Sequence, residues 1–99
     1  MASWFLDVDP RSLHVPSSRR AGADPIKLHR QIARFGTSTA GMPPIWVYQC
    51  TDGGLVIFNG VTRATRVAKL CPGMLVRVEV VGKVGRAGAG LPKIGELIA

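Results

Sequence analysis

The pattern of apolar and polar positions predicts short β-strands interrupted by two helices. Between Met74 and Val81, apolar residues alternate with Arg77 and Glu79, which is typical of a strand with one solvent-facing side. Runs rich in β-branched and aromatic residues predict three more strands. The expected strands cover residues 4–8, 45–50, 55–58 and 74–81.

The apolar run Leu55-Val56-Ile57-Phe58 predicts a central strand covered on both faces. The turn sequence Thr51-Asp52-Gly53-Gly54 precedes it and predicts a hairpin with the strand at 45–50. Trp46 and Tyr48 lie on that preceding strand, where core packing is favoured over a base-stacking role.

Capping and helix-terminating residues indicate where two predicted helices begin and end. Asp24 is expected to cap the first, Pro25 suits its first turn, and Gly36 suits its end. The second helix is expected from Thr62 to Leu70. An apolar stripe at helical spacing is expected to turn the first helix towards the core: Leu28, Ile32 and Phe35.

These elements predict a small single-domain α+β fold. The domain is expected over residues 1–81, followed by a Gly-rich basic C-terminal segment at 82–99. No apolar run approaches the length of ~20 residues that a membrane-spanning helix needs.

The charge balance narrows the class of partner. The chain holds 13 Lys and Arg against 6 Asp and Glu, a net charge of +7 and a pI near 10.5. The positive electrostatic field of such a chain favours nucleic acid, nucleotides or an acidic protein as a partner. The alternative is that the charge serves solubility alone. The cysteines and histidines lack metal-ligand spacing, so no metal site is expected from them: Cys50, Cys71, His14 and His29.

The most specific chemical feature is the turn Asn59-Gly60-Val61-Thr62-Arg63 between a strand and a helix. Glycine lets a backbone approach an anion, and the free N–H groups of the helix start favour a phosphate there. Thr62 adds a hydroxyl, Arg63 adds a guanidinium, and Arg66 is expected on the same side one turn later. The alternative is a plain turn followed by solvated arginines.

A second basic row lies on the first helix at Lys27, Arg30 and Arg34. A solvated polar face explains such a row equally well. The row gains a binding role if the fold places it beside Arg63.

Two motifs carry a resemblance to a known family. Asp24-Pro25-Ile26-Lys27 and Gly60-Val61-Thr62-Arg63, with Pro43-Pro44-Ile45 between them, resemble the ParB/sulfiredoxin-like domain over residues 4–81. The resemblance implies a mixed sheet of about four strands with two main helices. It also implies a nucleotide site lined by Lys27 and by the helix positions of Arg30 and Arg34.

The chain departs from the family's motifs at positions that the family's known activities need. Val61 stands where sulfiredoxins carry their cysteine, so sulfinic-acid reductase activity is not expected. Val61 and Thr62 also replace the Glu-Arg pair of ParB proteins. Gly60, Thr62 and Arg63 remain as phosphate-facing positions, with Asn59 and Val61 completing the turn.

The resemblance implies a ParB-like toxin or nuclease domain of bacterial polymorphic toxins that acts on nucleic acid or a nucleotide. In this interpretation Thr62 and Arg63 are catalytic and Arg66 assists. Such a domain acts in the cytoplasm, arrives as part of a larger secreted toxin, and pairs with an acidic immunity protein. Mg²⁺ or a nucleoside triphosphate is the cofactor compatible with it. The alternative is a non-catalytic module that binds a nucleotide or DNA and is regulated by a partner.

Overall fold

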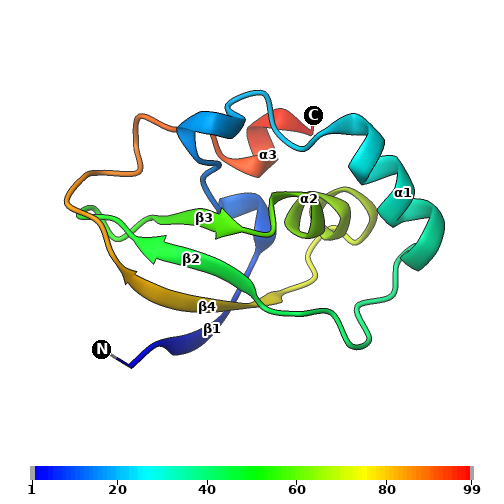
Figure 1. The fold of residues 1–99 in the computed structure, drawn as a ribbon, viewed down its shortest axis with the longest axis horizontal. Helices are drawn as coiled ribbons and strands as arrows, with labels where there is room; N and C mark the ends of the chain where they lie inside the picture. The colour runs from blue at the N-terminus through cyan, green and yellow to red at the C-terminus, as the bar shows by residue number, and fades with distance from the viewer. Residues whose placement is uncertain (1, 99) are drawn as a thin grey trace.

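The computed structural model describes residues 2–98, which form a four-stranded mixed sheet and three α-helices. Figure 1 shows the helices gathered beside β3, with β1 farthest from them. The predicted α+β class, with about four strands and two main helices, is confirmed. The strands are β1 (Trp4–Val8), β2 (Ile45–Gln49), β3 (Leu55–Asn59) and β4 (Val76–Lys83). The α-helices are α1 (Pro25–Phe35), α2 (Val61–Leu70) and α3 (Ile94–Leu97). Two short 3-10 helices precede them, η1 (Pro10–Ser12) and η2 (Ser17–Arg19).

The sheet has the strand order β1-β4-β2-β3. β1 pairs with β4 and β2 pairs with β3 in antiparallel fashion, whereas β2 and β4 run parallel. A parallel pair needs a crossover, and here β3 and α2 supply it between β2 and β4. The predicted hairpin of β2 and β3 is therefore confirmed, and α2 packs across the inner face of the sheet.

The prediction that residues 55–58 form a central strand is wrong. β3 is the last strand in the sheet order, and the central pair is β4 and β2. His14 explains the apolar sequence, because its backbone amide donates to Leu55 O and its carbonyl accepts from the amide of Ile57. The segment around His14 thus covers part of the β3 edge, so Val56 and Ile57 are buried while Phe58 is 57% exposed.

One face of the sheet carries the core. The buried apolar residues of this core come from the segment after η1, the sheet, α2 and α3: Leu13, Val15, Ile45, Val47, Ile57, Ala64, Val67, Ala68, Val76, Val78, Val80 and Ile94. Burial of this side-chain set is the main stabilising term for a domain of this size.

The opposite face of the sheet is open to solvent. Trp46, which was expected in the core, is 42% exposed, and Phe5 on β1 is 50% exposed. The two residues lie in register with Glu79 of β4 between them. The sheet is therefore covered on one face only, and the expectation of a buried Trp46 is corrected.

α1 has the predicted ends but a weaker inner face. Asp24 caps it, since its Oδ1 accepts from the amides of Ile26 and Lys27 at 2.8 and 3.4 Å. Gly36 ends it with a φ of 54°. None of the α1 residues is fully buried, and Phe35, expected to face inward, is 44% exposed.

The C-terminal segment packs against the rest of the chain. β4 continues to Lys83, past the expected domain boundary at residue 81, and Ile94 of α3 is part of the core. α3 packs on η1 and α2. Within residues 2–98 every helix is too short or too polar to span a bilayer.

Candidate phosphate-binding cleft

A single glycine joins β3 to α2. Gly60 has a φ of 118° and a ψ of 21°, a conformation that residues with a side chain rarely adopt. A Cβ at this position would lie 3.0 Å from Arg63 Nη2 and 3.2 Å from the side chain of Ile45. Both the backbone conformation and the space around it therefore require glycine at the turn.

The N-terminus of α2 is open. The first helical hydrogen bond runs from the amide of Ala64 to Gly60 O at 2.9 Å, and no side chain caps the helix start. The amides of Val61, Thr62 and Arg63 precede that bond, so they lack a partner within the helix. α1 differs, because the Asp24 carboxylate occupies its first amides. Of the two main helices, α2 is the one whose positive end remains available to an anion.

A cleft of about 380 Å³ lies in front of this turn. Its walls are the turn itself, the start of α1 and the residues around η2. The volume falls within the range of small-ligand sites. Six of the predicted site residues line the cleft: Lys27, Asn59, Gly60, Val61, Thr62 and Arg63.

Arg63 is held in the cleft wall by one backbone hydrogen bond. Its Nη2 donates to the carbonyl oxygen of Pro44 at 3.1 Å. Its Nε is buried and has no hydrogen-bond partner among residues 2–98. Burial lowers the pKa of the Arg63 guanidinium from its ordinary value, because the charged form loses water. An anion bound beside a partly desolvated cation offsets part of the hydration that the cation has lost.

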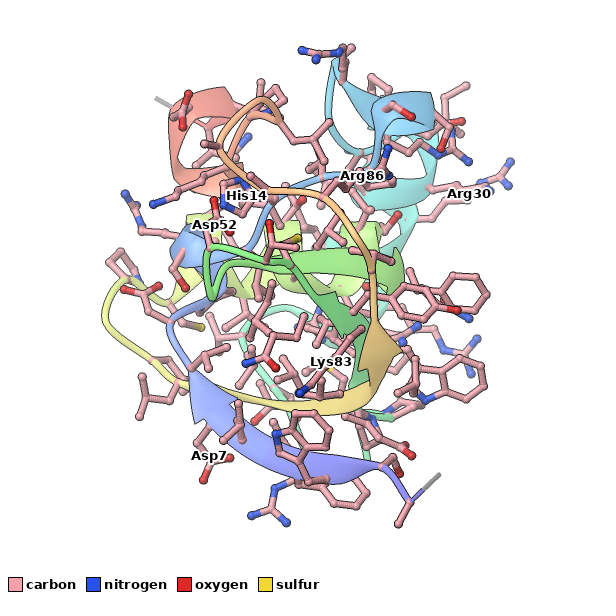
Figure 2. All side chains as sticks on the ribbon, turned by 90° about the vertical axis from the view of Figure 1, so that its left-hand side faces the viewer. Asp7, His14, Arg30, Asp52, Lys83 and Arg86 are labelled. Atoms are coloured by element: carbon pink, nitrogen blue, oxygen red, sulfur yellow. The ribbon has the colours of Figure 1, made fainter. Side chains whose placement is uncertain are left out.

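Three predicted binding residues lie elsewhere. Arg30 projects outward from α1 (Figure 2) and Arg34 lies 5.2 Å from the ring centroid of Phe35, so neither lines the cleft. Arg66 is 2% exposed, and its guanidinium is occupied by carbonyl oxygens of the protein. The expectation that Arg66 faces the same phosphate as Arg63 is corrected, because the body of α2 is buried on all sides.

The cleft also holds residues that the sequence did not assign to it. Arg19 lies in its wall and adds a third cation to Lys27 and Arg63. The basic loop Ser17-Ser18-Arg19-Arg20 was the available signal for it. Asp24, expected from the sequence to cap a helix, is the one carboxylate among the described residues that line the cleft. Phe58 lines its rim, which the expected burial of β3 had obscured.

Other titratable groups do not assemble into a metal site. Among residues 2–98 no group of three or more His, Cys, Asp or Glu side chains is placed to hold a metal ion. Cys50 is buried, Cys71 is partly exposed, and both thiols are free.

Comparison of the chain with protein-family models and with curated proteins gives no match.

Proposed function

We propose that this chain is a phosphate-binding domain that acts on nucleic acid or on a nucleotide through its Gly60–Arg63 turn. The observation that carries the proposal is that the open N-terminus of α2 and the half-buried cation Arg63 line the same cleft. Phosphate oxygens accept hydrogen bonds from helix-start amides and from guanidinium groups, and the positive helix end favours their charge.

In the proposed binding mode, both sides of the cleft contact the phosphate. On one side, the amides of residues 61–63 and the Thr62 hydroxyl donate to the phosphate. On the other, Lys27 and Arg19 neutralise its remaining charge. Arg30 and Arg34, which lie outside the cleft, add at most a weak attraction that salt screens.

The ParB/sulfiredoxin-like resemblance is part of this proposal. The two motifs that suggested it, at residues 24–27 and 60–63, both contribute to the cleft although they are far apart in the sequence. The proposal excludes sulfinic-acid reduction because Val61 replaces the required thiol.

We propose phosphodiester hydrolysis of the toxin-nuclease type as the reaction. Asp24 is the available general base, since it is the carboxylate of the cleft, and Arg63 would stabilise charge on a phosphoryl oxygen. A carboxylate together with substrate phosphates is also a donor set that Mg²⁺ uses, so Asp24 would hold that ion if it takes part. The same proposal includes delivery within a larger toxin and an acidic immunity protein as partner.

One observation favours the alternative of a non-catalytic nucleotide- or DNA-binding module. Asp24 Oδ1 already accepts two backbone hydrogen bonds at the start of α1. A carboxylate oxygen that already caps a helix is less available to take a proton from an attacking water molecule.

Plasmid and RNA degradation with Mg²⁺ or Mn²⁺ tests these proposals. Asp24→Asn is the sharpest variant, because asparagine caps a helix about as well as aspartate and removes only the ionisable carboxylate. We expect cleavage by the wild type, its loss in Asp24→Asn and in Arg63→Ala, and its retention in Arg30→Ala outside the cleft.

Two outcomes change the conclusion. A folded wild type that binds oligonucleotides in an Arg63-dependent way without cleaving them is the non-catalytic module. A wild type that binds neither oligonucleotides nor inorganic pyrophosphate contradicts the phosphate site itself.

A further inference from the structure

Three aromatic side chains form a cluster on the open face of the sheet. Trp46 and Tyr48 come from β2 and Phe58 comes from β3. The rings of Trp46 and Phe58 are nearly parallel, with an interplanar angle of 9° and centroids 6.3 Å apart. Tyr48 meets Phe58 edge to face at 5.4 Å. We call these three residues the aromatic platform.

Two of the three platform rings are largely open to solvent. Trp46 is 42% exposed and Phe58 is 57% exposed, whereas their inward-facing neighbours Val47 and Ile57 are buried. The centroid separation shows that the parallel rings are offset, so each leaves part of a face uncovered. Adjacent exposed aromatic rings of this kind are typical of a binding surface.

The platform continues into the phosphate-binding cleft. Phe58 belongs to the platform and also lines the cleft, and only Asn59 separates it from Gly60. A phosphate at the Gly60–Arg63 turn therefore places its attached nucleoside beside the Phe58 ring. Trp46 extends the same surface across β2, opposite Asn59 in the sheet register.

We propose that the aromatic platform stacks the bases of single-stranded nucleic acid whose backbone enters the cleft. This inference rests on the proposed function and names its substrate class. Unpaired bases expose the faces that aromatic rings stack on, whereas a duplex buries them between neighbouring base pairs. The platform adds affinity without reading sequence, because every base has a stackable face.

Charge favours nucleic acid over a protein copy as the occupant of the platform. The chain carries a net charge of +7, and three cations, Arg19, Lys27 and Arg63, line the adjoining cleft. A second copy of the chain brings the same positive charge and is repelled. A polyanion is attracted by the cleft and brings its bases to the platform.

Fluorescence anisotropy of labelled decathymidylate tests the proposal, with the strand free or annealed to its complement below the melting temperature of the duplex. EDTA is present to prevent metal-dependent cleavage. We expect tighter binding of the single strand. Phe58→Ala and Trp46→Ala should each weaken single-strand binding at least about fivefold, the lower end of the effect of removing one stacking ring. Phe5→Ala is the matched control, because Phe5 is 50% exposed and lies on β1 at the other edge of the sheet.

A fluorescence readout identifies the ring that is contacted. The chain has two tryptophans, so Trp4→Phe leaves Trp46 as the sole indole. We expect the single strand to quench Trp46 emission, and inorganic pyrophosphate, which has no base, to leave it unchanged. Unquenched emission at saturating decathymidylate contradicts stacking on Trp46.

Failure of the platform is distinguishable from failure of the cleft. If pyrophosphate binds in an Arg63-dependent way but Phe58→Ala binds decathymidylate as tightly as the wild type, the phosphate site stands and the platform is wrong. If neither ligand binds, both proposals are wrong. Equal losses in Phe5→Ala and Phe58→Ala, or a dimer that Phe58→Ala dissociates, also overturn the platform.

Discussion

Arg66 is a buried cation of α2 whose hydrogen bonds connect this helix to the end of α1. Its Nη1 donates to Gly36 O at 2.7 Å and to Ser38 O at 2.9 Å, at the end of α1 and in the loop that follows. The guanidinium also lies 5.4 Å from the ring centroid of Phe35. Each of these acceptors is neutral, so hydrogen bonds and the aromatic ring, rather than a carboxylate, offset the loss of hydration.

We expect Arg66→Met to lower the free energy of unfolding by about 3 kcal/mol, because the carbonyl oxygens of Gly36 and Ser38 lose a charged hydrogen-bond donor. Arg66→Lys should lose at least about 1 kcal/mol, since an ammonium cannot reproduce the planar fork. Urea unfolding followed by tryptophan fluorescence measures both. Arg30→Ala, on the exposed face of α1, is the control and should stay within about 0.5 kcal/mol of the wild type. An unchanged Arg66→Met midpoint would show that the buried guanidinium costs as much as it contributes.

The residue-level predictions succeeded where a local rule applied. Asp24 caps α1 because a short carboxylate reaches the next two amides, and Gly60 takes a conformation that its neighbours cannot. Arg66 escaped prediction because its surroundings come from α1 and the loop after it. Its helical spacing from Arg63 gave no sign of that burial.

At the level of elements, boundaries were more predictable than neighbours. β1 and the β2–β3 hairpin follow from local sequence patterns. The position of β3 at the sheet edge does not, because it depends on β4, which comes later in the chain and pairs with the other side of β2. The exposure of Trp46 has the same cause. Periodicity gives two faces to a strand, but only the packing of α2 decides which face is covered.

The loop between β4 and α3 is held by hydrogen bonds from distant residues. Asp52 in the hairpin turn accepts from the amides of Gly88 and Ala89 at 3.1 and 3.2 Å. His14 Nδ1 lies 2.8 Å from Leu91 O in the same loop. Figure 2 shows His14 and Asp52 together beneath this segment. The Gly-rich sequence therefore lies against the hairpin turn.

Asp52→Asn should destabilise the fold at neutral pH and flatten its acid dependence. The amides of Gly88 and Gly54 hold the pKa of the Asp52 carboxyl below its ordinary value. A lowered folded-state pKa means that the stabilisation is complete above the unfolded pKa, about 3.9, and is lost as pH falls through the folded value. Asparagine has one acceptor oxygen and no charge, so it holds the loop less well and does not titrate.

Urea unfolding midpoints at pH 7 and at about pH 3 test this prediction. The wild type should lose more of its midpoint between the two conditions than Asp52→Asn does. Asp7→Asn removes a carboxylate from an exposed pair with Arg77 and serves as the control, with a small effect at pH 7. Identical acid dependence in wild type and Asp52→Asn would mean that the loop does not depend on the ionised carboxylate.

At the scale of the whole molecule, the core and the aromatic platform lie on opposite faces of the sheet. α2, η1 and α3 cover the inner face of the sheet, and the outer face leaves the aromatic platform open. The cleft lies where the β3 end, α1 and η2 meet, at the edge of that platform. A strand of nucleic acid bound in this way would contact few of the basic residues that give the chain its charge of +7.

The salt dependence of binding tells a local site from a general attraction of the whole surface. Each phosphate neutralised on a single strand contributes about −0.7 to the slope of log affinity against log salt. Three cleft cations, Arg19, Lys27 and Arg63, therefore predict a slope of about −2, whereas engagement of the full net charge predicts about −5. Lys27→Ala should reduce the slope by about 0.7, and Lys83→Ala, at the exposed end of β4, should leave it unchanged. Anisotropy titrations with single-stranded decathymidylate over a range of salt concentrations measure both slopes. Equal reductions in the two variants would show that the positive charge of the whole surface holds the nucleic acid. The cleft would then not be a specific binding site.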